Sequence, residues 1–370
     1  MKTSIDVVIP SFRLEEKYIL PILQLPLPET ATVRFYLVAD NPAIVPAPAI
    51  RALVDGQRVF LYIHPENRGA AMTRNTGLEA GRGEWVLFLD DDIVVPQHLL
   101  QTYARAALQQ PGEIGFIGLI HFPPAASAFT KAIQVSGSMD IFSIAGRKPS
   151  FAWGATANIM VKRSAIGEVR FSAVYPKSGG GEDMDFFLHV RERNGFRDFR
   201  SLPEAAVQHP WWNNDRVNFT RPYRYGKGNS WLGQLNPRYT YYDFLNTPET
   251  LLLAVLAGIV LVFVHPLALV PLVVFLAGVM LIEAIASAVQ ALKRDKRSNM
   301  QIMFYVMALR LVHDIGMLQG KLSRGGFHRI GERFHDNGVI NKWYFYRTNT
   351  YKLVKWVLYP LLGWAVWRLF

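Results

Sequence analysis

The chain has 370 residues, of which 50% are hydrophobic, and its formal net charge is +11 at pH 7. This length exceeds one average domain, so we expect a core of ordinary size and an additional segment. The sequence contains no cysteine, which excludes disulfides, cysteine-ligated zinc and thiol nucleophiles. The first ten residues lack the apolar stretch and cleavage site of a signal peptide, so the N-terminal part is expected to stay where it is synthesised.

The first part of the chain alternates between strand-like and helix-like patterns. Runs rich in β-branched and aromatic residues predict five strands, at 5–10, 33–40, 59–64, 84–89 and 114–122. Composition and spacing predict helices over 69–80 and 97–109. Apolar strands that alternate with helices indicate an α/β fold with a Rossmann-like, mostly parallel sheet that is covered on both faces. Ligands bind to such folds beyond the carboxyl ends of the strands, which is where Asp40 and Asp90 lie.

The composition changes near residue 247, where two uncharged stretches begin. They cover 251–264 and 267–282, and with their flanking residues each reaches the roughly 20 residues that cross a bilayer. A buried helical hairpin in a soluble core is the alternative, but helices this apolar would need burial on every side. The basic cluster at 293–297 follows directly, so the positive-inside rule places it, and the N-terminal domain, in the cytoplasm.

Most of the excess positive charge lies after these stretches. Residues 293–370 contain 14 Lys and Arg but 4 Asp and Glu, whereas the residues before them contain 26 and 25. A cationic tail beside apolar helices is typical of contact with anionic lipid headgroups. We therefore expect membrane lipids, and no nucleic acid, as partners of this charge.

The tail is expected to be helical and associated with the membrane. Residues 300–322 are apolar but include Arg310, His313 and Asp314, which favours an amphipathic helix at the interface. The segment 342–368 is rich in Trp and Tyr, as is typical of the headgroup zone. Its end, 353–370, is either a short re-entrant helix or a third span. The predicted organisation is a catalytic domain at 1–243, a transmembrane hairpin at 244–292 and a basic, aromatic tail at 293–370.

Two acidic clusters are candidates for chemistry. The carboxylates of Asp90, Asp91 and Asp92 follow an apolar strand and repel one another unless a cation is present. Hard oxygen ligands of this kind suit Mg²⁺ or Mn²⁺, although a solvated turn or a helix N-cap would also explain them. In the second cluster, glycines at 179–181 precede Glu182, Asp183 and Asp185. An aspartate at this helix start can act as a general base, and simple helix capping is the alternative.

Five motifs occur in order over roughly the first 210 residues. They are IDVVIPSFR (5–13), LVAD (37–40), ENRGAAMTRNTGLEAGRGEWVLFLDDD (66–92), FAWGATANIMVKR (151–163) and GGGEDMDFFLHVRERNG (179–195). Together they resemble the family 2 glycosyltransferases, which have a GT-A fold. No single motif is decisive, but five in this order are highly specific.

The resemblance implies a role for each matching residue. Asp90 and Asp92 match an Asp-x-Asp motif that bridges the donor diphosphate through Mn²⁺ or Mg²⁺. Asp183 matches the general base, and Glu182 beside it would shape the sugar or acceptor site. The residues expected to bind the nucleotide sugar are Pro10, Ser11, Arg13, Asp40 (near the base), Arg74, Asp90, Asp91 and Trp153.

Residues after the last motif are further candidates. His209 matches a third metal ligand of many GT-A enzymes, although a lone histidine is more often structural. Trp211 and Trp212 either form an apolar wall for the sugar or pack the domain. Arg221 and Arg224, with the nearby Lys227, either clamp a diphosphate or form a basic face over lipid headgroups.

One departure bears on the product. Processive synthases of this superfamily, such as those of cellulose and chitin, have a Gln-x-x-Arg-Trp motif, whereas this chain has QHPWW at 208–212. Two or three spans also cannot form a polymer channel, so one sugar per encounter is expected. The predicted enzyme is an inverting glycosyltransferase that uses a nucleoside diphosphate sugar, with uridine as the commonest base. Its expected acceptor is a lipid-linked hydroxyl or phosphate in cell-envelope glycan or glycolipid synthesis.

Two other functions are open alternatives. A nucleotidyltransferase would also use paired aspartates, but it would need a lysine-containing glycine-rich loop that 11–16 (SFRLEE) does not provide. A non-catalytic membrane scaffold that binds nucleotide or lipid would not need the acidic clusters. The sugar, the linkage and the oligomeric state are left open by the sequence.

Overall fold

The computed structural model describes residues 2–177, 179–340 and 349–370. These residues form two compact units. The first comprises Met1–Pro124 and Met139–Asn214, and the second comprises Ala125–Ser138 and Asp215–Phe370. The second unit therefore includes a short segment from the first half of the chain. Of the expected aromatic tail, Trp343, Tyr344 and Tyr346 lie outside the described residues.

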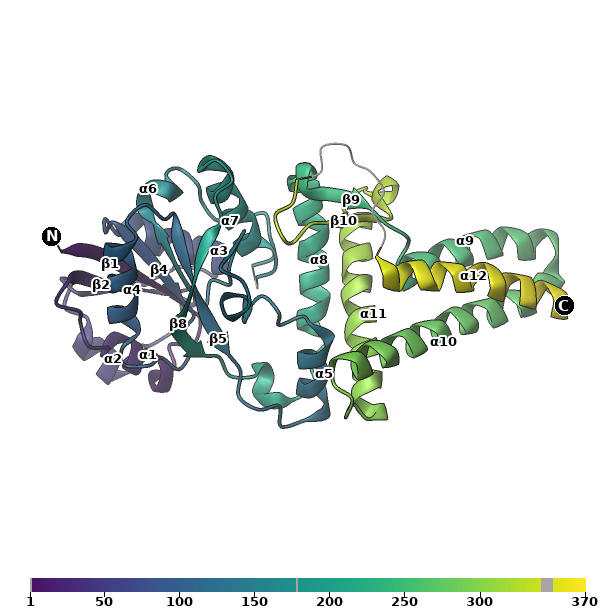
Figure 1. Cartoon of the computed structure of the whole chain (residues 1–370), viewed down its shortest axis with the longest axis horizontal. Helices are drawn as coiled ribbons and strands as arrows, with labels where there is room; N and C mark the ends of the chain where they lie inside the picture. Colours follow the sequence, from purple (N-terminus) through teal and green to yellow (C-terminus); the bar gives the residue numbers. More distant parts are fainter. Residues whose placement is uncertain (1, 178, 341–348) are drawn as a thin grey trace. The chain divides into compact units, whose positions relative to one another are not determined.

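The first unit is built on an eight-stranded sheet with the order β3-β2-β1-β4-β7-β5-β8-β6 (Figure 1). Its strands are β1 (Thr3–Ser11), β2 (Ala31–Ala39), β3 (Val59–Ile63), β4 (Trp85–Leu89), β5 (Gly115–His121), β6 (Ser150–Phe151), β7 (Asn158–Lys162) and β8 (Phe199–Gln208). Strands β6 and β7 run antiparallel to their neighbours, and the others share one direction. The mostly parallel α/β fold is thus confirmed.

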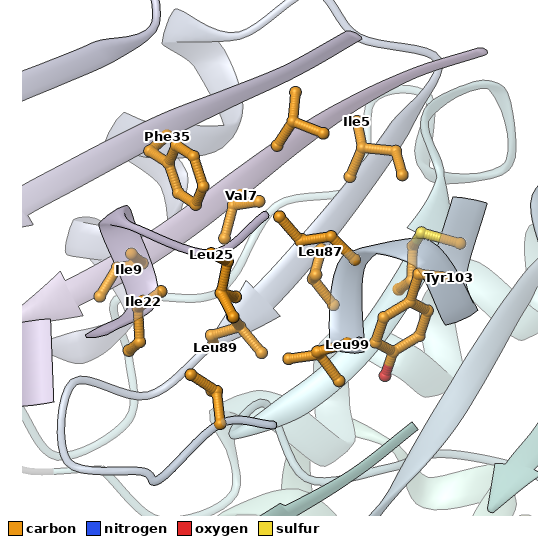
Figure 2. Close-up of a cluster of buried hydrophobic side chains, with 14 of the residues drawn as sticks. Ile5, Val7, Ile9, Ile22, Leu25, Phe35, Leu87, Leu89, Leu99 and Tyr103 are labelled. Atoms are coloured by element: carbon orange, nitrogen blue, oxygen red, sulfur yellow. The ribbon is translucent and has the colours of Figure 1, made fainter. Parts of the chain in front are cut away.

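Helices cover both faces of this sheet (Figure 1). They are α1 (Glu16–Leu23), α2 (Pro48–Leu53), α3 (Ala70–Ala80), α4 (Leu99–Gln109), α6 (Arg163–Ile166) and α7 (Glu182–Arg193), with a 3₁₀ turn η1 at Ile144–Gly146. On one face, alternate residues of β1 and β4 pack against α1 and α4, with labelled side chains that include Ile5, Val7 and Leu87 (Figure 2). Burying each such side chain fully contributes about 1.5–3 kcal/mol. This core fixes the strand ends from which the site is built.

A bulge shapes strand β8, which leads into His209. The register of β5 with β8 shifts between Gly118 and Leu119. The buried amide of Asn158 fills the gap, because its Nδ2 donates to the carbonyl oxygens of Leu119 at 3.1 Å and Ala205 at 2.7 Å. The irregular backbone is therefore satisfied by hydrogen bonds, and the end of β8 is held firmly in place.

The second unit is mostly helical. It contains α5 (Ala128–Ser136), α8 (Thr220–Leu235), α9 (Thr247–Val264), α10 (Leu269–Arg294), α11 (Met300–Leu322), α12 (Thr350–Leu369), the antiparallel strands β9 (Thr240–Tyr242) and β10 (Glu332–Phe334), and the 3₁₀ turns η3 (Pro237–Tyr239), η4 (Pro266–Ala268) and η5 (Phe327–Arg329). A further turn, η2 (Trp212–Asp215), joins the two units in sequence. Helices α8 and α11 run side by side, while α9, α10 and α12 run together in another direction (Figure 1).

Three helices are long and apolar enough to cross a membrane. By length and composition these are Thr247–Val264, Pro266–Arg294 and Met300–Leu322, among the residues that the structure describes. The first two are the expected hairpin, so the prediction of apolar C-terminal helices is confirmed. The third is the segment expected to lie at the interface, and residues 353–370 form most of α12.

Candidate active site

The candidate site lies where parallel strands of the first unit end. Strands β1, β2, β4 and β8 lead at their carboxyl ends into Ser11, Asp40, Asp90 and His209. Because these strands share one direction, their ends meet at the same edge of the sheet. The fold therefore brings together residues that are nearly 200 positions apart in the chain.

Asp90, Asp92 and His209 form a cluster that could hold a metal ion. One ligand atom of each lies within 4.8 Å of the others. His209 Nε2 is 3.2 Å from Asp92 Oδ1, and its Nδ1 is 2.7 Å from the carbonyl oxygen of Pro210. A carbonyl accepts only, so Nδ1 carries a proton and donates it to Pro210, while Nε2 faces the carboxylate. This orientation leaves Nε2 and the two carboxylates available to bind a divalent cation between them, so the residues fit a metal site.

Aromatic rings hold the His209 side chain in place. Its ring centroid lies 5.6 Å from that of Phe122 and 5.5 Å from that of Trp212. Trp211 stacks on Phe122 at 4.7 Å and donates its Nε1–H to the carbonyl oxygen of Pro123 at 3.0 Å. The indole N–H of Trp211 is therefore engaged in packing, and the half-buried Trp212 packs against Phe122, Phe142 and His209.

The middle aspartate of the triplet is turned toward β1. Asp91 Oδ2 accepts a hydrogen bond of 2.5 Å from Ser11 Oγ, which in turn accepts one from the amide of Leu14 at 2.9 Å. Burial raises the pKa of Asp91 to about 6. The exposed Arg13 lies 3.5 Å from Asp92. Asp91 thus secures the loop after β1, while Asp90 and Asp92 belong to the metal cluster.

Asp40 holds the turn that begins α3. Its Oδ1 accepts hydrogen bonds from the amide of Arg68 and from His64 Nδ1, both at 2.8 Å, and its Oδ2 accepts one from the amide of Gly69 at 2.7 Å. Gly69 has a φ of +87°, and a Cβ there would lie 2.7 Å from the Cα of Lys177. Only glycine fits this position. Sequence reasoning missed His64 and Gly69, although the glycine in the ENRG motif was a usable signal.

Arg74 on α3 joins the two acidic clusters. Its buried guanidinium places Nη2 3.3 Å from Asp90 Oδ1 and Nη1 3.1 Å from Glu182 Oε1. The other oxygen of Glu182 accepts a hydrogen bond of 2.6 Å from the amide of Gly180. Arg74 therefore links the metal cluster to the start of α7, which carries Asp183.

Asp183 sits at the start of α7 behind a loop that requires glycine. Gly179, Gly180 and Gly181 have φ values of +85°, +129° and +100°, a region that other residues rarely adopt. Burial and, to a lesser extent, the carboxylate of Glu182 raise the pKa of the half-buried Asp183 to about 7, while Arg74 opposes the rise. A carboxyl group with this pKa is suited to accept a proton near neutral pH.

The other expected site residues are less closely grouped. Pro10 is half-buried in β1, and Trp153 is buried just before β7. Arg221 and Arg224 lie on α8 in the second unit, where Arg221 donates to the hydroxyl of Tyr225 at 3.2 Å. Their role toward a diphosphate stays a prediction.

A mostly parallel sheet with an Asp-x-Asp at its edge that could hold a metal ion is typical of the class of nucleotide-sugar transferases with a GT-A fold. The sequence matches the family described as glycosyl transferase family 2 over residues 6–160, and glycosyl transferase family group 2 over residues 85–312. The second match covers more than half of the chain, which therefore belongs to the family 2 glycosyltransferases.

Known relatives agree with this assignment. The chain is 31% identical over 193 residues to the succinoglycan biosynthesis protein ExoM of Rhizobium meliloti (strain 1021). The aligned region covers 50% of this chain and 59% of the relative. The chain is 39% identical over 79 residues to the succinoglycan biosynthesis protein ExoO of the same strain, covering 21% and 22%. The chain thus spans less than two thirds of both relatives.

A solved structure shares the fold. The mannosyltransferase PcManGT from Pyrobaculum calidifontis, solved in complex with GDP-Man and Mn²⁺, superposes with a TM-score of 0.51. The match covers 87% of this chain and 88% of that protein, at 17% identity. At this identity the likeness supports the fold alone.

Proposed function

We propose that the chain transfers a single sugar, with inversion, from a nucleoside diphosphate sugar to a hydroxyl or phosphate of a membrane-bound, lipid-linked acceptor. The observation that carries the proposal is the meeting of Asp90, Asp92 and His209 with Arg74 and Asp183 at one edge of the sheet. Relatives that act in succinoglycan biosynthesis support a role in cell-envelope glycan or glycolipid synthesis.

The donor is held by its diphosphate and by its nucleoside. A Mn²⁺ or Mg²⁺ ion held by Asp90, Asp92 and His209 would neutralise the negative charge of the leaving diphosphate. The Mn²⁺ and GDP-Man in the structure of the mannosyltransferase support this metal and this class of donor. Uridine and guanosine diphosphate sugars are both candidate donors, and the residues that contact the base decide between them.

The transfer itself is a single displacement. The anomeric carbon forms a bond to the acceptor oxygen while its bond to the phosphate oxygen breaks, and the diphosphate leaves with that electron pair. For a hydroxyl acceptor, the proton moves to the carboxylate of Asp183, whose pKa of about 7 is suited to this role. A phosphate acceptor is already ionised and needs no base, so the effect of removing Asp183 reveals the class of acceptor.

The membrane helices support a lipid-linked acceptor. Helices α9 and α10 would hold the chain at the bilayer, where anionic lipids would contact the basic residues after α10. An acceptor carried by a polyprenyl phosphate, a polyprenyl diphosphate or a glycolipid would then be confined to the same surface.

The test uses the membrane-embedded protein. It is incubated with UDP-, GDP- and dTDP-sugars and Mn²⁺ or Mg²⁺, with and without host lipid extract, while release of nucleoside diphosphate is measured. Asp183→Asn should bind the donor normally and lose about 10²–10⁴-fold in transfer to a hydroxyl acceptor. Glu192→Gln, on the same helix α7 but at its far end, should retain transfer.

Two results would contradict the proposal. Normal transfer to a hydroxyl acceptor by Asp183→Asn would remove Asp183 as the base. Unchanged Mn²⁺ affinity in Asp92→Asn, measured by electron paramagnetic resonance in the presence of the nucleotide, would remove the metal site.

A further inference from the structure

The apolar helix α11 packs along a polar helix for much of its length. Its partner α8 carries Arg221, Arg224 and Lys227. The two helices approach closely at glycines, since a Cβ at Gly226 would collide with the carbonyl oxygen of His313 and one at Gly316 with that of Tyr223. Helix α11 cannot enter a bilayer without carrying this polar helix with it.

The charges of α11 also lie in its middle. Arg310, His313 and Asp314 occupy the central turns of the 23-residue helix Met300–Leu322. At the centre of a bilayer, Arg and Asp cost about 2.5–3.5 kcal/mol each. The length and mean hydropathy of α11 suit a span, but the position of its charges does not.

Helix α12 has the opposite pattern. Residues 356–367 contain no charged side chain, and Lys355 and Arg368 flank them. The side chains of Leu361, Trp364 and Trp367 are 57%, 60% and 71% exposed in the protein. Tryptophan and arginine at the end of an apolar helix are typical of a membrane interface. Lysines and aromatic residues lower the mean hydropathy of α12, although its apolar part is continuous.

The helices α9, α10 and α12 share a polar cluster at one level, which we call the Glu283 cluster: Glu283, Thr247, Ser287, Tyr351 and Lys355. Glu283 Oε2 lies 2.6 Å from Lys355 Nζ and also accepts a hydrogen bond from Thr247. Its Oε1 accepts from Ser287 at 3.0 Å and from Tyr351 at 2.5 Å. Glu283 and Lys355 are both buried, so the pair is fully enclosed by protein.

Beyond the Glu283 cluster, each of the three helices has an uncharged stretch. Thr250 to Val264 on α9 corresponds to about 21 Å at 1.5 Å per residue, and Leu269 to Ile282 on α10 to about 20 Å. Trp356 to Trp367 on α12 corresponds to about 17 Å. The hydrocarbon core of a bilayer is about 30 Å thick, so these helices would thin the bilayer locally around them. The exposed apolar stretches of all three helices therefore begin at one level and suit insertion into the same bilayer.

We infer that α9, α10 and α12 insert into the bilayer, with its near boundary at the Glu283 cluster, while α11 lies with α8 at that surface. The partner of this three-helix surface is the lipid bilayer. Residues 265 and 370 then lie on the far side of the membrane from residues 296, 323 and 350. This inference does not depend on the proposed transfer reaction.

Single cysteines test the inference directly, because the native chain has none. The full-length chain is labelled with a membrane-impermeant maleimide in sealed right-side-out and inverted vesicles of the expression host, at five exposed positions: Lys296→Cys, Ser323→Cys, Thr350→Cys, His265→Cys and Phe370→Cys. The first three should react from one side of the membrane and the last two only from the other. Labelling after detergent addition confirms that each thiol is reactive.

Each contrary pattern overturns part of the inference. If Ser323→Cys reacts from the side opposite to Lys296→Cys, α11 crosses the membrane. If Phe370→Cys reacts from the same side as Thr350→Cys, α12 does not cross. Leu361→Cys should stay unreactive from both sides until detergent is added, and earlier labelling would exclude its burial in lipid. None of these measurements needs a donor or an acceptor, so failure here is distinct from failure of the proposed transfer.

Discussion

Arg74 contacts both acidic clusters, and its replacement gives a quantitative test of the site. The guanidinium reaches Asp90 at 3.3 Å and Glu182 at 3.1 Å through different nitrogens. A lysine amine is a single point charge and reaches one of the two. A hydrogen bond to a charged partner contributes about 1.5–3 kcal/mol, so Arg74→Lys should lower kcat/KM by about 10- to 150-fold.

Arg74→Met should have a larger effect on kcat/KM than Arg74→Lys and also change the pH dependence. It leaves Glu182 buried without its cation, which costs about 3–5 kcal/mol of folding stability. Arg74 lowers the pKa of Asp183, which must be deprotonated to act as a base, so loss of Arg74 should move the rising, acidic limb of the pH–rate profile above about pH 7. Arg74→Lys keeps the charge and should leave the limb near its original position. Glu182→Gln removes a like charge and should move the limb toward acid.

The measurement is nucleoside diphosphate release as a function of pH at saturating Mn²⁺. Arg82→Met, an exposed arginine just after α3, is the matched control and should change neither rate nor limb. A limb that stays in place or moves toward acid in folded Arg74→Met would refute the electrostatic link between Arg74 and Asp183. The free energy of unfolding also depends on the protonation of Asp183. The pKa of Asp183 in the folded protein lies above its ordinary value, so the stability that this residue contributes is lost as the pH rises through about 7.

Two further predictions concern the metal site and the second unit. His209→Gln should weaken Mn²⁺ binding at least about tenfold in a direct titration. The control His189→Gln, on the exposed side of α7, should leave the Mn²⁺ affinity unchanged. Equal affinities of the two variants would exclude His209 as a ligand. Gly226→Ala should destabilise the detergent-solubilised protein by about 1–3 kcal/mol in thermal unfolding, because the new methyl group meets the carbonyl of His313. Gly363→Ala, where the nearest atom would be 3.9 Å away, should not be destabilising, and equal effects would contradict the close packing.

The sequence predicts features that depend on local patterns. Apolar runs mark the parallel strands, and the position of Asp90 and Asp92 after such a run marks the edge of the sheet where ligands bind. The three glycines before Glu182 indicate a special backbone, and all three have positive φ values. The histidine was found through the resemblance, but the proton on its Nδ1 follows only from the position of the Pro210 carbonyl.

Features that depend on distant partners could not be predicted in this way. Arg74 and Glu182 are 108 positions apart, and no periodicity shows that they pair. Asp40 was expected near the nucleotide base, but its oxygens also hold the turn at Arg68 and Gly69, which only the folded chain reveals. Antiparallel β7 lies between β4 and β5 because the chain returns across the sheet, an arrangement set by the whole fold and by no local signal.

Glu283 shows why composition alone misjudges a membrane helix. From the sequence it is a lone acid late in an apolar stretch, a position from which a side chain can reach water. In the structure its partner Lys355 lies 72 positions away on α12, so each charge is neutralised where the helices meet. Both residues lower the mean hydropathy of their helices. Because they pair at one end of the apolar segments of α10 and α12, however, these segments are uninterrupted. Arg310 of α11 also lies 3.8 Å from Glu283, so pairing does not distinguish the two helices. The position of the charges along each helix, more than their number, therefore favours α12 over α11 as the helix that enters the lipid.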